Sequence, residues 1–212
     1  MSEQSSLADY EARVAGLRAT RGDDHPDTLA AMLDLAEALW AEGKLAKVRP
    51  LEEHVVAARR RLLGEAHGDT LKALGKLATT IGAQGDLAEM RRLQEEVVAL
   101  APAAWGEEAR DTLRASNNLA GTIATMGEGE AARALLETTI ERMHRLLGEA
   151  DTDTLAAIAN LASMLWQYGE RGEAYWLQCH VYETHRTARG DNDPATRAAL
   201  SVLDAMQRDG MP

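Results

Sequence analysis

Apolar residues recur at helical spacing in four segments of the chain, and each segment opens with the same three letters, Asp-Thr-Leu. In the second segment one stripe of an α-helix, at about 100° per residue, carries Leu71, Leu74, Leu77, Ala78 and Ile81. Equivalent stripes lie at 113–123 and 155–165. This spacing predicts amphipathic helices that bury one face.

Glycine recurs every 42 residues in two series, at 22, 64, 106, 148 and 190 and at 43, 85, 127 and 169. We expect the second series to end the first helix of each period in the left-handed conformation. The first series would end a second helix. His25 and His67 stand just before the first helices and are expected to help cap them.

Two helices per 42-residue period predict an all-α, right-handed solenoid of antiparallel helix pairs with about ten helices. We expect a single domain over 1–212. It would comprise a capping helix at 5–21, helix pairs at 22–63, 64–105, 106–147 and 148–189, and a C-terminal capping helix at 190–212. Asp204 replaces an alanine that recurs at 36, 78, 120 and 162. Asp204 should therefore be more exposed than those alanines.

The pattern "HPDTL…NNLA…G…A..L…LG" resembles the tetratricopeptide repeats of kinesin light chains and their bacterial relatives, and it covers residues 22–190. The copy nearest to this pattern lies at 111–137. Pro50 matches a proline that this family tolerates early in its second helix. Asn118 and Asn160 match the second of the family's paired asparagines, whereas Asp34 and Lys76 replace it elsewhere. The resemblance implies that a peptide or helical segment of a partner protein binds a concave groove lined by the first helices. No heptad segment accompanies it, so a motor role is not implied.

The positions opposite the leucine stripes locate this groove independently. Cations occupy three of them in the middle two repeats, which carry no acidic residue there, and the cations would suit an acidic or carboxylate-bearing partner. Two tryptophans share one repeat phase at the border of the core and are candidate anchors, although a tryptophan at such a border more often fills space between helices. The predicted partner-binding residues are Lys72, Lys76, Arg114, Asn117, Asn118, Asn160, Ser163, Gln167, Trp40 and Trp166.

Composition narrows the function further. A formal net charge of −11 argues against nucleic acid as the partner, which needs a basic surface. No apolar run approaches the roughly 18 residues of a membrane span, and 1–16 lack the features of a signal peptide. One cysteine, Cys179, fits a reducing compartment, so we expect a cytoplasmic protein.

Signals for catalysis are weak. Only the "CHVYETH" segment, 179–185, gathers residues worth testing for a metal or a nucleophile, and helical spacing separates Cys179 and His185 from His180. We therefore predict a non-enzymatic interaction module with no cofactor and no metal. Two alternatives stay open: a scaffold that self-associates through 5–20 and 194–208, and a small-molecule binder or enzyme accessory protein that uses the same groove.

Overall fold

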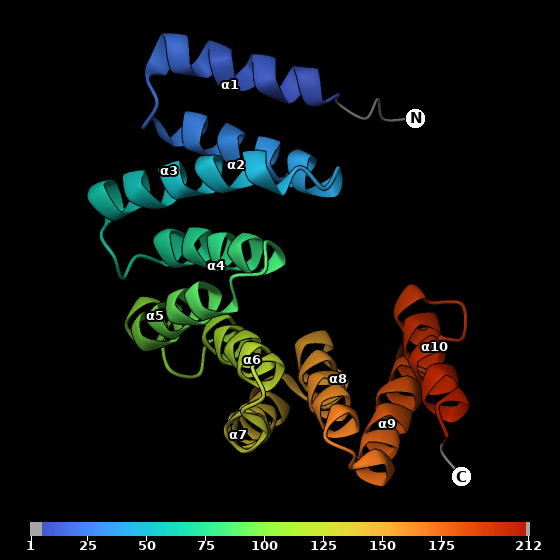
Figure 1. The fold of residues 1–212 in the computed structure, drawn as a ribbon. Coiled ribbons are helices and arrows are strands. Elements are labelled where there is room, and N and C mark those ends of the chain that lie inside the picture. Colours follow the sequence, from blue (N-terminus) through green and yellow to red (C-terminus); the bar gives the residue numbers. More distant parts are fainter. Residues whose placement is uncertain (1–5, 211–212) are drawn as a thin grey trace. The chain divides into compact units, whose positions relative to one another are not determined.

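The computed structural model describes residues 6–210, and ten α-helices account for most of them (Figure 1). The described residues contain no strand, which confirms the predicted all-α class. The helices are α1 (Leu7–Arg21), α2 (Pro26–Ala41), α3 (Leu45–Leu63), α4 (Gly68–Ala83), α5 (Leu87–Trp105), α6 (Arg110–Thr125), α7 (Gly129–Leu147), α8 (Thr152–Gln167), α9 (Arg171–Arg189) and α10 (Pro194–Arg208).

The recurring Asp-Thr-Leu explains how α2, α4, α6 and α8 begin. Its aspartate lies in the first turn, where the positive end of the helix dipole favours an acid. Its threonine is buried, and the hydroxyl of Thr28 donates to the carbonyl of Gly22 in the preceding loop at 2.8 Å. The same bond recurs from Thr70 and from Thr112. In these three copies the triplet therefore fixes the loop as well as the helix, whereas the buried hydroxyl of Thr154 in the fourth copy has no hydrogen-bond partner among the described residues.

The predicted caps at the two ends of these helices are confirmed. Nδ1 of His25 accepts a hydrogen bond from the backbone N–H of Asp27 at 3.2 Å, and His67 caps α4 in the same way. Gly43 ends α2 with a φ of 71°. Its N–H donates to the carbonyl of Trp40, and the next N–H donates to the carbonyl of Leu39, as in a Schellman motif. The glycines at 85, 127 and 169 end α4, α6 and α8 with the same pair of bonds.

The chain divides into two compact units, Met1–Trp105 and Gly106–Pro212. In the first unit each of α1 to α4 packs against the next helix. In the second unit each of α6 to α9 packs against the next, and α6 also contacts α8. The helix pairs α2–α3, α4–α5, α6–α7 and α8–α9 each lie inside one predicted repeat range.

Small residues allow the close approach of paired helices. The alanines at 36, 78, 120 and 162 are all buried, whereas Asp204 at the same phase of α10 is exposed, as predicted. In the second unit Leu155, Ile158, Val181 and Ala199 form a shared core cluster from α8, α9 and α10. This cluster holds together the three helices that line a cavity of the unit.

Candidate functional site

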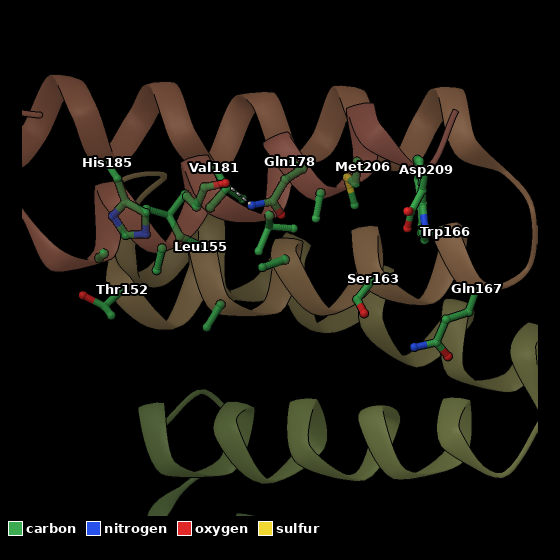
Figure 2. A pocket seen from close by; sticks show the side chains of 17 residues that line it. Thr152, Leu155, Ser163, Trp166, Gln167, Gln178, Val181, His185, Met206 and Asp209 are labelled. Carbon is green, nitrogen blue, oxygen red and sulfur yellow. Dashed lines mark hydrogen bonds between the residues drawn. The ribbon is translucent and has the colours of Figure 1, made fainter. Parts of the chain in front are cut away.

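The second unit contains a cavity of about 510 Å³ that we call the apolar groove (Figure 2). Three predicted partner-binding residues of α8 line it: Ser163, Trp166 and Gln167. The other lining residues come from α8 (Thr152, Leu155, Ala156, Ala159), α9 (Gln178, Val181, His185), α10 (Ala195, Ala198, Ala199, Val202, Ala205, Met206) and the residue that follows it by one position (Asp209).

The apolar groove has walls of small side chains and a mostly apolar floor. Alanines of α8 and α10 form much of the walls, and Val181 of α9 lies between them. Gln178 lies in the floor, and its Nε2 donates a hydrogen bond to the carbonyl of Ala199 at 3.2 Å (Figure 2). Because this donor is engaged within the protein, the groove offers its occupant chiefly apolar surface.

Apart from Gln178 and Ser163, the polar groups of the apolar groove lie at its two ends. Figure 2 shows His185 and Thr152 at one end and Trp166, Gln167 and Asp209 at the other. The guanidinium of Arg171 lies over the Trp166 ring, 5.1 Å from its centroid, and also donates to the carbonyl of Asp209 at 2.9 Å. These contacts hold Trp166 in place at the end of the groove.

Burial lowers the pKa of His185, and the nearby charge of Arg189 acts in the same direction. Asp193 opposes both effects. His185 is buried and its Nδ1 has no hydrogen-bond partner among the described residues. A lowered pKa disfavours a charged imidazole at this end of the apolar groove.

The first unit contains a smaller cavity, about 260 Å³, between α2, α3 and α4, which we call the charged cavity. Trp40 and Lys76, both predicted as binding residues, line it. The other lining residues are Ala36, Glu37, Glu52, Thr79 and Thr80. The charged cavity therefore combines an aromatic ring with two carboxylates and one ammonium group.

The predicted cations have acidic neighbours that the sequence analysis did not pair with them. Lys76 pairs with Glu37 of α2, and Arg114 lies 3.5 Å from a carboxylate oxygen of Asp153 in α8. Lys72 lies over the Trp105 ring, 6.0 Å from its centroid. The middle two repeats carry no acid of their own on this face, but the neighbouring helices α2 and α8 supply acids beside Lys76 and Arg114.

The predicted asparagines differ in exposure. Asn118 and Asn160 are exposed, whereas Asn117 is buried. Nδ2 of Asn160 donates to Oδ1 of Asn117 at 3.0 Å, so these two amides link α6 to α8. Asn117 therefore serves the packing of the second unit.

Sequence reasoning missed the contributions of α9 and α10 to the apolar groove, and it missed Glu52. The segment 190–212 is expected above to be a cap or a surface for self-association, although α10 begins at the same repeat phase as α2, α4, α6 and α8 and so presents an equivalent face. The repeat phase alone could have identified Val202 and Ala205, which stand one repeat after Asn160 and Ser163. Glu52 could have been noticed because glutamine stands at the same phase in Gln94 and Gln178.

The segment 179–185 does not form a metal site in the structure. His180 Nε2 lies 3.2 Å from a carboxylate oxygen of Glu149, and its ring stacks on Trp176. Among residues 6–210, no three histidine, cysteine, aspartate or glutamate side chains are grouped so that they could bind a metal ion. Across the same described range, none of the helices has the length and apolar character that a membrane span requires.

Comparison with known proteins supports the repeat architecture. A model of the tetratricopeptide repeat family matches residues 28–69 and 112–153. Two solved structures contain nearly identical TPR-like repeats of a candidate kinesin light chain from Podosopora anserina. The sequence of each is 28% identical to this chain. One has a TM-score of 0.75 and covers 86% of either chain; the other has a TM-score of 0.72 and covers 86% of this chain and 87% of that chain.

The structure of BtubC (BKLC) from P. vanneervenii has a TM-score of 0.78 over 95% of this chain and 82% of that chain, and at 17% identity it shows the shared fold alone. A comparison with curated protein sequences gave no significant match. Tetratricopeptide repeats are generally protein–protein interaction modules. The chain is therefore a helical repeat protein, and the family model and the solved structures that match it are those of tetratricopeptide repeat proteins of the kinesin light chain-like type.

Proposed function

We propose that the protein is a non-enzymatic interaction module that holds an amphipathic helix of a partner protein in the apolar groove. The observation that carries this proposal is the 510 Å³ apolar groove between α8 and α10, with small side chains on both walls. Small side chains let another helix approach closely, and large apolar side chains of that helix would fill the space.

The dimensions of the apolar groove support a helix of about four turns as its occupant. Its lining extends from Ala195 to Asp209, along the whole of α10. A helix of 15 residues is about 22 Å long, so an occupant of similar length would contact both ends. Apolar side chains at positions i, i+3, i+4 and i+7 would face the protein.

The charge of the lining favours an apolar partner face over an acidic one. Asp209 lies at one end, and no lysine or arginine is among the lining residues. The predicted cations Lys76 and Arg114 are paired with Glu37 and Asp153. An acidic partner would therefore gain little from either set of residues, because each cation already has a carboxylate.

The proposal can be tested by selecting binders from a displayed library of 14-residue amphipathic helices with variable apolar positions. The full chain is the target, and selected peptides are then measured by fluorescence anisotropy against two variants. Val202 lines the groove and is 43% exposed, whereas Leu200 on the same helix is 40% exposed and is not among the lining residues. Val202→Glu should weaken binding at least about tenfold by placing a charge against the apolar face. Leu200→Glu should leave binding unchanged.

Equal effects of the two substitutions, or a selection that yields no apolar pattern, would contradict the proposal. Sedimentation of the chain alone distinguishes the self-associating scaffold. A dimer that Val202→Glu dissociates and Leu200→Glu does not would mean that a second copy occupies the apolar groove. Displacement of the selected helices by a small apolar molecule would instead favour a small-molecule binder.

A further inference from the structure

The charged cavity and the apolar groove occupy equivalent places in the repeat. Trp40 and Trp166 stand three repeats apart, and so do Glu52 and Gln178. Each cavity lies between consecutive even-numbered helices, with the intervening odd-numbered helix beneath. Because the backbone positions are equivalent, the difference between the two cavities comes from their side chains.

Glu52 is the most unusual side chain of the charged cavity. Only 5% of its surface is exposed, although glutamate is almost never fully buried without a partner. Thr80 Oγ1 donates a hydrogen bond to its Oε2 at 2.6 Å. An ionised carboxylate can accept about four hydrogen bonds, so this one bond leaves most of its capacity for a further donor.

The charges that face Glu52 are those of Glu37 from α2 and Lys76 from α4. The ammonium group of Lys76 pairs with Glu37, and it also favours the ionised form of Glu52. The single ammonium group of Lys76 thus lies near two carboxylates, those of Glu37 and Glu52, and neutralises the charge of only one of them. A cation from a partner would neutralise the second negative charge.

We propose that the charged cavity is a second recognition site, which takes an arginine side chain of a partner protein. This inference does not depend on the proposed function, because it concerns a different cavity in the other unit. Trp40, 38% exposed, would stack on the guanidinium plane. Glu52, and Glu37 beside it, would accept its N–H groups.

Size and shape favour one arginine side chain over a larger ligand. A volume of about 260 Å³ lies below the roughly 300–1,000 Å³ of small-molecule pockets. Arginine also suits the site better than lysine, because its planar fork both stacks on an aromatic ring and donates to two acceptors.

The test is an NMR titration of the full chain with Nα-acetyl-arginine N-methylamide. The reporter is the indole N–H of Trp40, assigned by its loss in Trp40→Phe, and the other three tryptophans serve as internal references. We expect a saturable shift of this signal with a dissociation constant on the order of 1 mM. The citrulline analogue, which has nearly the same shape but no charge, should bind at least about tenfold more weakly.

Glu52→Gln identifies the carboxylate responsible. Glutamine stands at this phase in two other repeats, so the fold accommodates it. The substitution should weaken arginine binding about tenfold, because a charge-assisted bond is lost. Glu53→Gln is the matched control, since Glu53 is exposed, pairs with Arg49 at 2.7 Å and is not among the lining residues. Lys76→Met should tighten binding severalfold by removing the competing ammonium.

Three outcomes would overturn the proposal: no shift of the Trp40 signal, equal binding of the citrulline analogue, or unchanged arginine binding by Glu52→Gln. An equal shift at Trp166 would overturn it too, because the apolar groove carries no carboxylate at the equivalent floor position. Since only the charged cavity is probed, none of these results bears on helix binding by the apolar groove.

Discussion

The two cavities show how one repeat backbone can be given opposite chemistry. Where the charged cavity has Glu37, Glu52, Lys76 and Thr80, the apolar groove has Ser163, Gln178, Val202 and Met206. The periodic tryptophan lines both cavities, as Trp40 in the charged cavity and Trp166 in the apolar groove. The residues that repeat set the position of a cavity, and the residues that differ set what it can bind.

The largest expected effect comes from exchanging the floor residue. Gln178→Glu would place a carboxylate against the carbonyl of Ala199, which now accepts a hydrogen bond from Gln178. Met206 stands in the apolar groove where Thr80 stands in the charged cavity, and its side chain cannot donate a hydrogen bond to the new carboxylate. We expect urea unfolding at pH 7 to show a loss of about 3 kcal/mol, from an unpaired buried charge and a lost bond. Part of this loss should be recovered at pH 4, where a protonated carboxyl can donate to the carbonyl. A loss below about 1 kcal/mol at pH 7 would mean that the floor of the groove is not as apolar as its lining indicates.

The comparison also explains what the sequence could predict. Helix number, helix ends and the buried alanine positions depend on local, periodic signals such as Gly43 and Asp-Thr-Leu, and these predictions are confirmed. The sequence also places Ser163 and Gln167 on one face of their helix and Trp166 at the border of the core, because helical spacing fixes which side chains lie together, and all three line the apolar groove.

The ion pairs could not be predicted in the same way. Lys76 and Glu37 lie 39 residues apart in sequence, and their contact depends on the spacing and rotation of two neighbouring helices. Long side chains of exposed residues choose among several partners by a small free-energy difference. Helical periodicity places each charge on a face, but it does not specify which opposite charge it meets.

The two tryptophans offer a second way to test the comparison. Trp166 is partly buried under the guanidinium of Arg171, whereas Trp40 is 38% exposed in the charged cavity. We expect Trp166→Ala to lower the free energy of unfolding by about 2 kcal/mol and Trp40→Ala by about 1 kcal/mol, since less packed surface is lost in the second case. Chemical denaturation of both variants measures the difference. A larger effect at Trp40 would show that the first ring has the greater structural role.

The equivalent odd-numbered helices α3 and α9 carry different residues near their ends. His185 of α9 stands three repeats after Arg59 of α3, whose guanidinium donates to the carbonyl of Asp69. The pKa of His185 is lowered from its ordinary value of 6.5, chiefly by burial, so protonation favours the unfolded chain. The contribution of His185 to the free energy of unfolding is full above pH 6.5 and is lost as the pH falls through the folded-state pKa of this residue. We expect His185→Gln to reduce the loss of stability between pH 7.5 and pH 5.5, measured by urea unfolding. His144→Gln, at an exposed histidine, is the control and should leave that pH dependence unchanged.

The smallest expected effect is that of Glu52→Gln on the free protein. Burial raises the pKa of Glu52 above its ordinary value of 4.5, against the lowering effects of the Thr80 hydrogen bond and the charge of Lys76. The folded state therefore binds the proton more tightly than the unfolded chain, and the wild type loses stability as the pH rises from 4.5 through the folded-state pKa. The variant should lack this decline and differ from the wild type by less than about 1 kcal/mol at pH 7, because the glutamine oxygen still accepts from Thr80. Urea unfolding of both proteins at pH 4.5 and pH 7 measures the sign. If the wild type instead gained stability over this range relative to the variant, the carboxylate would already be well compensated by Lys76, and the charged cavity would have little left to offer a second cation.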